Sequence, residues 1–155
     1  MELDKVRNQL DYYDNIIQNM LTLRLSVIPI VADIKKRNNL SIVHKDREKA
    51  MYSKMEKIAL ENGISANLLC DVYKNVISEA IKLEYIFLDD GYRKFTLKDK
   101  DMNDALKSME KIDTVICNDL SKEVQKLKDI AKSYNITLYD LALIYHKNIL
   151  DEKEK

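Results

Sequence analysis

The sequence predicts an all-α protein, and three observations support this. Its 155 residues include only 2 glycines and 1 proline, whereas sandwiches and barrels need frequent turn residues. Apolar residues recur at steps of three or four along most of the chain, which is the period of an amphipathic helix. Charged residues make up 34% of the chain and suit the solvated outer faces of helices.

A long first helix is predicted from near Leu3 to the Asn38-Asn39 pair. Pro29 should bend this helix without breaking it, because the apolar period continues on both sides of the proline. The apolar positions that set this period are Val6, Leu10, Tyr13, Ile17, Met20, Leu21, Leu25, Ile28 and Ala32.

Two shorter helices follow the loop LSIVHK. The second begins near Asp46, a favourable N-cap, and ends at Asn62-Gly63, a common C-cap signal. The third is capped by Ser65 and ends at Asp89-Asp90-Gly91. Its apolar positions are Leu69, Val72, Val76, Ala80, Leu83 and Phe87.

The remainder, from about Phe95 to Leu150, is predicted to be helical as well. One apolar stripe runs from Met102 to Ile116 and another from Leu120 to Ala131, with Ser121 or Asn118 as possible caps between them. Tyr134-Asn135 interrupts the pattern, and Thr137 can cap a last helix. The segment GYRKFTLKDKD divides a predicted domain at 1–90 from a C-terminal helical extension at 91–155.

Composition excludes several classes of function. The formal net charge is zero, so no global field favours nucleic acid or an anionic membrane. Arg24 and Asp33 interrupt the longest apolar run, so no segment is predicted to span a membrane. The first residues lack the apolar core of a signal peptide. Cys70 and Cys117 lack metal-ligand spacing and are predicted to be reduced core thiols of a cytoplasmic protein.

Arg24 lies within the apolar run and has no acidic neighbour on its own segment between Asp14 and Asp33. A guanidinium held against an apolar face must meet an anion, because an unpaired buried charge is costly. That anion is either a carboxylate from another helix or a bound ligand. The alternative is that Arg24 is a solvated or snorkelling residue.

The helical period places a second cation near Arg24. Lys35 lies eleven residues later, which returns it to within about 20° of the same face and about 16 Å along the axis. Two long side chains can lean together over one small anion across that gap. Arg7 is rotated by about 100° from Arg24, so on a straight helix it should miss the pocket in its own chain, and it could serve a neighbour's pocket instead.

Glu84 is the complementary anomaly, because this acid shares an apolar face with Ile77, Ala80 and Leu88. It must pair with a cation or take up a proton. A structural bridge to Arg24 is one possibility, and such a bridge would be no sign of function.

Taken together, these positions resemble the active-site signature of the all-helical chorismate mutases. The stretches that carry the resemblance are VRNQLDYYDNIIQNMLTLR, ADIKK, DRE and EAIKLE, within about residues 3–90. The resemblance implies an intertwined dimeric bundle in the cytoplasm. It also implies a cofactor-free and metal-free isomerase that converts chorismate to prephenate in phenylalanine and tyrosine biosynthesis.

The resemblance also implies a role for each residue. Arg24 would hold a substrate carboxylate, and Lys35 would contact the ether oxygen and a carboxylate. Glu48 would accept from the ring hydroxyl, and Arg47 would help to hold a carboxylate or order the loop. Arg7 would be donated to the partner's pocket.

Many family members carry Gln where this chain has Glu84, and a carboxylate cannot donate to an ether oxygen whereas a carboxylic acid can. We therefore expect Glu84 to be protonated in the productive complex. Two other readings remain open at this point: an isochorismate pyruvate-lyase of the same fold, and a non-catalytic helical regulatory or interaction protein.

Overall fold

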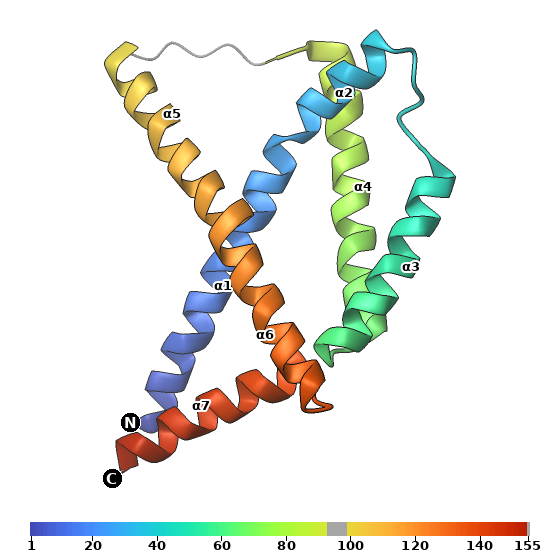
Figure 1. The fold of residues 1–155 in the computed structure, drawn as a ribbon. Coiled ribbons are helices and arrows are strands. Elements are labelled where there is room, and N and C mark those ends of the chain that lie inside the picture. The colour runs from blue at the N-terminus through green and yellow to red at the C-terminus, as the bar shows by residue number, and fades with distance from the viewer. Residues whose placement is uncertain (93–98, 155) are drawn as a thin grey trace. The chain divides into compact units, whose positions relative to one another are not determined.

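The computed structural model describes residues 1–92 and 99–154, and its regular elements are all helical (Figure 1). The all-α prediction is therefore confirmed, while the predicted helix start near Phe95 lies outside the described residues. The elements are α1 (Glu2–Ser26), α2 (Ile28–Arg37), α3 (Lys45–Asn62), α4 (Ala66–Asp90), α5 (Asp99–Thr114), the π-helical turn η1 (Val115–Leu120), α6 (Ser121–Ser133) and α7 (Leu138–Glu154).

The predicted long first helix is present as α1 and α2, joined through the single residue Val27. Val27 keeps right-handed helical dihedrals (φ −81°, ψ −19°), and its N–H donates to the Arg24 carbonyl at 3.2 Å. Pro29, in the first turn of α2, has no N–H to continue the ladder. The helix therefore continues past Pro29 with a local change in its hydrogen bonding, as the sequence predicted.

Most predicted helix ends are confirmed. Gly63 and Gly91 adopt φ values of +77° and +69° after α3 and α4, which glycine tolerates best. The Ser65 hydroxyl accepts the N–H of Leu68 at 3.2 Å and so caps α4. Asp46 lies within the first turn of α3 and is not its cap, since the His44 carbonyl already accepts the Glu48 N–H at 3.1 Å.

The predicted caps between the two C-terminal apolar stripes are wrong. Helices α5 and α6 are joined without a gap by η1. The wider π-helical turn shifts the position of the apolar residues around the helix axis, so one stripe ends and the next begins without a break in the helix. The Ser121 hydroxyl donates to the Ile116 carbonyl at 2.7 Å, so it satisfies a π-helical carbonyl and does not start a new helix.

The chain divides into two compact units, and helices α3 and α4 each contribute to both. Unit 1 comprises Met1–Glu48 and Asp71–Arg93, and unit 2 comprises Lys49–Cys70 and Lys94–Lys155. The boundary predicted between residues 90 and 91 remains a prediction. The buried residues of unit 1 are Ala32, Ile77, Ala80, Glu84 and Phe87, and those of unit 2 are Met55, Ala59 and Ala131.

In unit 2 the start of α7 lies against the turn after α3. Thr137 caps α7: its hydroxyl accepts the Asp140 N–H at 3.2 Å, and its own N–H donates to Asp140 Oδ2 at 2.8 Å. The backbone and then the hydroxyl hydrogen bonds from Thr137 lower the pKa of the Asp140 carboxyl. A Cβ at Gly63 would collide with the Thr137 side chain, so this approach also requires glycine.

Much apolar surface in the described part of the chain has no covering within the chain. No large side chain there is fully buried, and α1 contains no buried residue. Five of the exposed apolar residues on α1 follow alternating steps of three and four: Leu3, Val6, Leu10, Tyr13 and Ile17. Helices with this spacing commonly pack against another helix.

One helical stretch, Glu2–Arg37, is long and apolar enough to cross a membrane by length and composition alone. A core helix of a soluble protein meets the same criteria, so the prediction that no segment spans a membrane remains a prediction.

Both cysteines are free thiols, and Cys70 is half-buried. Cys117 is exposed, so its predicted place in the core is wrong for this chain.

Candidate functional site

Lys35 connects three parts of unit 1 through its ammonium group. Its Nζ lies 2.8 Å from Glu84 Oε1 on α4 and donates to the Ile42 carbonyl in the following loop at 2.8 Å. The side chain is 20% exposed. Lys35 is therefore held by two partners on different segments, although an ammonium has three N–H groups to donate.

Glu84 lies on the buried stripe of α4, where residues 77, 80, 84 and 87 follow helical steps. Its side chain is only 5% exposed, and it is the charged residue that the described structure buries most deeply. Its contact with Lys35 has the distance of an ion pair but not the alignment of a good hydrogen bond. The sequence predicted that Glu84 would face inward, and this is confirmed.

Arg24 remains without a carboxylate partner among the described residues. Its Nη1 is buried and makes no hydrogen bond to protein, although the side chain as a whole is half-buried. The structural bridge between Arg24 and Glu84 that the sequence left open is absent, since Glu84 pairs with Lys35. A buried guanidinium N–H without an acceptor is costly, and an anionic ligand would satisfy it.

The three other predicted residues are more open. Arg7 on α1 is 64% exposed and lies 3.9 Å from Asp4, one turn earlier on the same helix. Arg47 is exposed and Glu48 is half-buried at the start of α3. The structure brings together Lys35 and Glu84, and no hydrogen bond or ion pair joins either of them to these three residues in the described part of unit 1.

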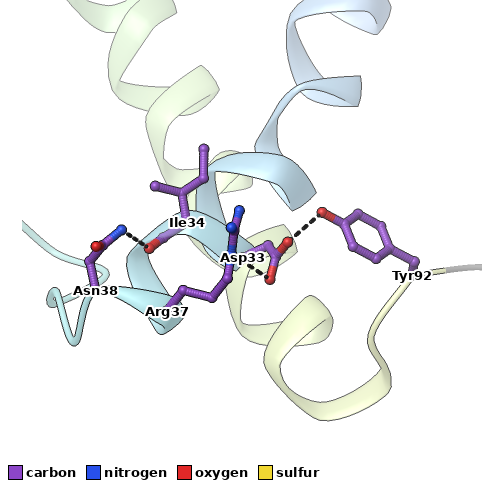
Figure 2. A network of polar contacts seen from close by, with 5 residues as sticks. All are labelled: Asp33, Ile34, Arg37, Asn38 and Tyr92. Atoms are coloured by element: carbon purple, nitrogen blue, oxygen red, sulfur yellow. Dashed lines mark hydrogen bonds and ion pairs between the residues drawn. The ribbon is translucent and has the colours of Figure 1, made fainter.

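A polar cluster beside Lys35 was not foreseen from the sequence. Figure 2 shows Asp33 accepting a hydrogen bond from the Tyr92 hydroxyl at 2.9 Å, while Arg37 Nε lies 3.6 Å from the other carboxylate oxygen. Asp33 and Tyr92 are 59 residues apart in sequence. No helical spacing could have revealed this contact, because it joins two elements.

The geometry has the character of a small-anion site with cations fixed in advance. One cation is tethered by a buried acid and a carbonyl, and another has a buried donor with no acceptor. Such groups suit the stabilisation of negative charge in a dry environment. The fold is thus all-helical, and its site residues are compatible with binding of a small anion.

Comparison with known proteins gives the family. The model of chorismate mutase type II matches residues 6–85, just over half of the chain. The chain belongs to this family, as the resemblance in its sequence implied.

Two curated relatives illustrate how the match is distributed. The chain is 26% identical over 93 residues to a chorismate mutase of Methanocaldococcus jannaschii, covering 60% of this chain and 94% of that protein. It is 31% identical over 83 residues to the T-protein of Enterobacter agglomerans, covering 54% of this chain but only 22% of the T-protein. No solved structure matches.

The buried pair predicts an asymmetric effect on stability. Lys35→Met should lower the free energy of unfolding by about 3 kcal/mol, because Glu84 would be left buried without its countercharge. Glu84→Gln should recover much of this loss in the Lys35→Met background, since a neutral amide needs no countercharge. Urea unfolding of the two variants at one protein concentration measures the difference. Equal stability of the single and double variants would contradict the prediction.

Proposed function

We propose that this protein is a chorismate mutase, which isomerises chorismate to prephenate by a pericyclic Claisen rearrangement in phenylalanine and tyrosine biosynthesis. Membership of the chorismate mutase type II family supports this activity. The observation that carries it is the 2.8 Å contact between Lys35 and Glu84. These are the two residues to which the sequence resemblance assigns the ether oxygen of the substrate.

The rearrangement needs no nucleophile. It needs the dianionic substrate held in a compact conformer and the developing negative charge on the breaking ether oxygen stabilised. The Lys35 ammonium group donates to the Ile42 carbonyl and pairs with Glu84, and these two contacts fix its direction. The third N–H is then free to donate to the ether oxygen in the transition state.

Arg24 supplies the main carboxylate contact in this proposal. The buried Nη1 has no acceptor in the protein, so a substrate carboxylate would satisfy it with a charge-assisted hydrogen bond. Glu48 would accept from the ring hydroxyl, and Arg47 would hold a carboxylate or order the loop before α3. Their positions at the start of α3, in the same unit as Lys35, are compatible with these roles.

Glu84 would change its protonation state on binding. In the free protein its carboxylate faces Lys35, whereas the dianion brings negative charge beside it and favours proton uptake. The carboxylic acid could then donate to the ether oxygen beside Lys35. Turnover would therefore depend on the availability of a proton.

We further propose a homodimer in which each pocket takes Arg7 from the partner. The described residues of unit 1 bury no residue of α1, and Arg7 lies on the same helix with its side chain largely exposed. Burying the apolar face of α1 against the partner's α1 would bring Arg7 to the other pocket. A cytoplasmic location and the absence of a cofactor belong to the same proposal.

The first test is turnover of chorismate, followed by loss of its absorbance. Arg24→Ala and Lys35→Ala should each lower kcat by about 10² or more, because these contacts act mainly in the transition state. Lys36→Ala, an exposed neighbour on α2, is the matched control and should retain wild-type turnover. Isochorismate is assayed in parallel, and release of pyruvate from it without mutase turnover would overturn the proposal. Absence of any turnover would leave a non-catalytic protein.

The pH profile tests the proton on Glu84. Wild-type kcat should fall as pH rises, since the ionised carboxylate cannot donate to the ether oxygen. Glu84→Gln should give a flat profile over the same range, because the amide donates at every pH. The measurement is kcat from about pH 5 to about pH 9. This range spans the pKa values of about 6 to 7 to which enzymes tune a catalytic glutamate. A falling profile that persists in the Gln variant would remove this role.

Complementation tests the exchange of Arg7. Arg7→Ala and Arg24→Ala protein, each nearly inactive, should regain about a quarter of wild-type turnover when unfolded and refolded together in equal amounts. Half of the dimers would be mixed, and each mixed dimer would have one pocket with both arginines. If Arg7 served its own pocket, no mixed dimer would contain an intact site and the mixture would remain inactive.

A further inference from the structure

Tyr92 lies just beyond the end of α4 and touches both helices that carry the central pair. Its hydroxyl donates to Asp33 Oδ2 on α2 at 2.9 Å (Figure 2). Its ring packs edge-on against Phe87 on α4, with ring centroids 4.8 Å apart. One residue therefore spans from α4 to α2.

Both contacts are one helical turn or less from the reacting groups of the proposed enzyme. Asp33 lies two residues before Lys35 on α2, and Phe87 lies three residues after Glu84 on α4. Phe87 is buried at 8% exposure, so the ring contact has a fixed base. Tyr92 therefore contacts α2 close to Lys35 in sequence and α4 close to Glu84 in sequence.

The backbone after α4 is shaped for this contact. The Gly91 N–H donates to the Phe87 carbonyl at 2.7 Å, and Gly91 adopts φ +69°, which turns the chain out of the helix. Tyr92 follows directly and folds back over the last turn of α4 onto Phe87. Arg37, one turn beyond Asp33, approaches the other oxygen of the same carboxylate and orients it.

From this geometry we propose that Tyr92 is a positioning residue for the site. Through Asp33 and Phe87 it holds α2 and α4 in the register that keeps the Lys35 ammonium against Glu84. This inference rests on the proposed function, to which it adds a residue outside the substrate pocket. The phenol is a suitable donor for this task at neutral pH. Partial burial, followed by the hydrogen bond to Asp33, raises its pKa above the usual value near 10.0.

A register role differs from a simple contribution to stability. Tyr92 is half exposed, so the loss of its hydroxyl should have little effect on folding. Displacement of a catalytic group by a fraction of an ångström can nevertheless lower a rate, because the transition state depends on alignment. The substrate's carboxylate contacts would remain, so binding should change little.

The experiment compares Tyr92→Phe with Tyr139→Phe. Tyr139 on α7 has the same exposure of 53%, and its hydroxyl makes no hydrogen bond in the described structure, so its variant controls for the loss of a hydroxyl. Tyr92→Phe should lower kcat for chorismate by about 5- to 10-fold, with KM within about twofold and an unchanged Tm. Tyr139→Phe should change none of the three. A kcat within about twofold of wild type for Tyr92→Phe would overturn the proposal.

A double-mutant cycle with Asp33→Ala tests whether Tyr92 acts through Asp33. Adding Tyr92→Phe to Asp33→Ala should cause no further loss of kcat, since the hydrogen bond is already absent. If the double variant lost kcat by the product of the two single losses, Tyr92 and Asp33 would act independently. That result would overturn the role assigned to their hydrogen bond.

A measurement without turnover separates this inference from the proposed function. The carboxyl carbon of Glu84, labelled with ¹³C and assigned by its loss in Glu84→Gln, reports the pairing with Lys35. Its resonance should move in Tyr92→Phe and stay in place in Tyr139→Phe. If wild-type protein failed to convert chorismate, the proposed function would be wrong. The resonance would still show whether Tyr92 keeps Lys35 against Glu84. An unmoved resonance in Tyr92→Phe would overturn the positioning role.

Discussion

The ion pair between Lys35 and Glu84 is the contact on which the arrangement of the site depends. It joins α2 to α4 at 2.8 Å and lies largely out of water. A buried pair of this kind contributes little net stability, because desolvation offsets most of the attraction between the charges. Its value is positional: an acid and a cation are fixed in a low-dielectric site before any ligand arrives, so little reorganisation is needed during the reaction. The burial of Ala32, Ala80 and Phe87 beside the pair keeps water away from it.

The near-continuous helix from Glu2 to Arg37 sets the positions of the cations. Arg7, Arg24 and Lys35 all lie along it, and Val27 allows the chain to pass Pro29 while retaining helical dihedrals. Eleven residues are close to three turns, so the helical period predicts a shared face for Arg24 and Lys35. The same regularity exposes an apolar face on α1 that no part of the described chain buries. A helix of this kind is well suited to a site that uses residues from two chains, since one rigid element carries groups for both.

Sequence alone gave the helices and most of their ends, because glycines, Ser65 and Thr137 act on the backbone within a few residues. It also gave the inward direction of Glu84, which follows from the helical period of α4. It named Arg24 as one possible partner of Glu84 and did not foresee Lys35, because the period fixes angles about one axis and not the register between two helices. The contact of Tyr92 with Asp33 was missed for the same reason. Ser121 was misread as a cap because a hydroxyl can bond to a π-helical carbonyl as readily as it caps a helix.

The proposed site would link substrate binding to association of the chains, because it would take its arginines from both chains. Arg24 and Lys35 would supply the two positive charges that a dianion requires once Glu84 is protonated. The partner's arginine at position 7 would add a further charge-assisted contact to a substrate carboxylate. Any ligand that binds only the complete pocket must stabilise the dimer by the same free energy with which dimerisation improves binding. The exposed face of α1 and the unpaired Nη1 of Arg24 would then have one physical explanation: neither is satisfied by the residues that the structure describes, and the proposed complex of two chains with the dianion would satisfy both.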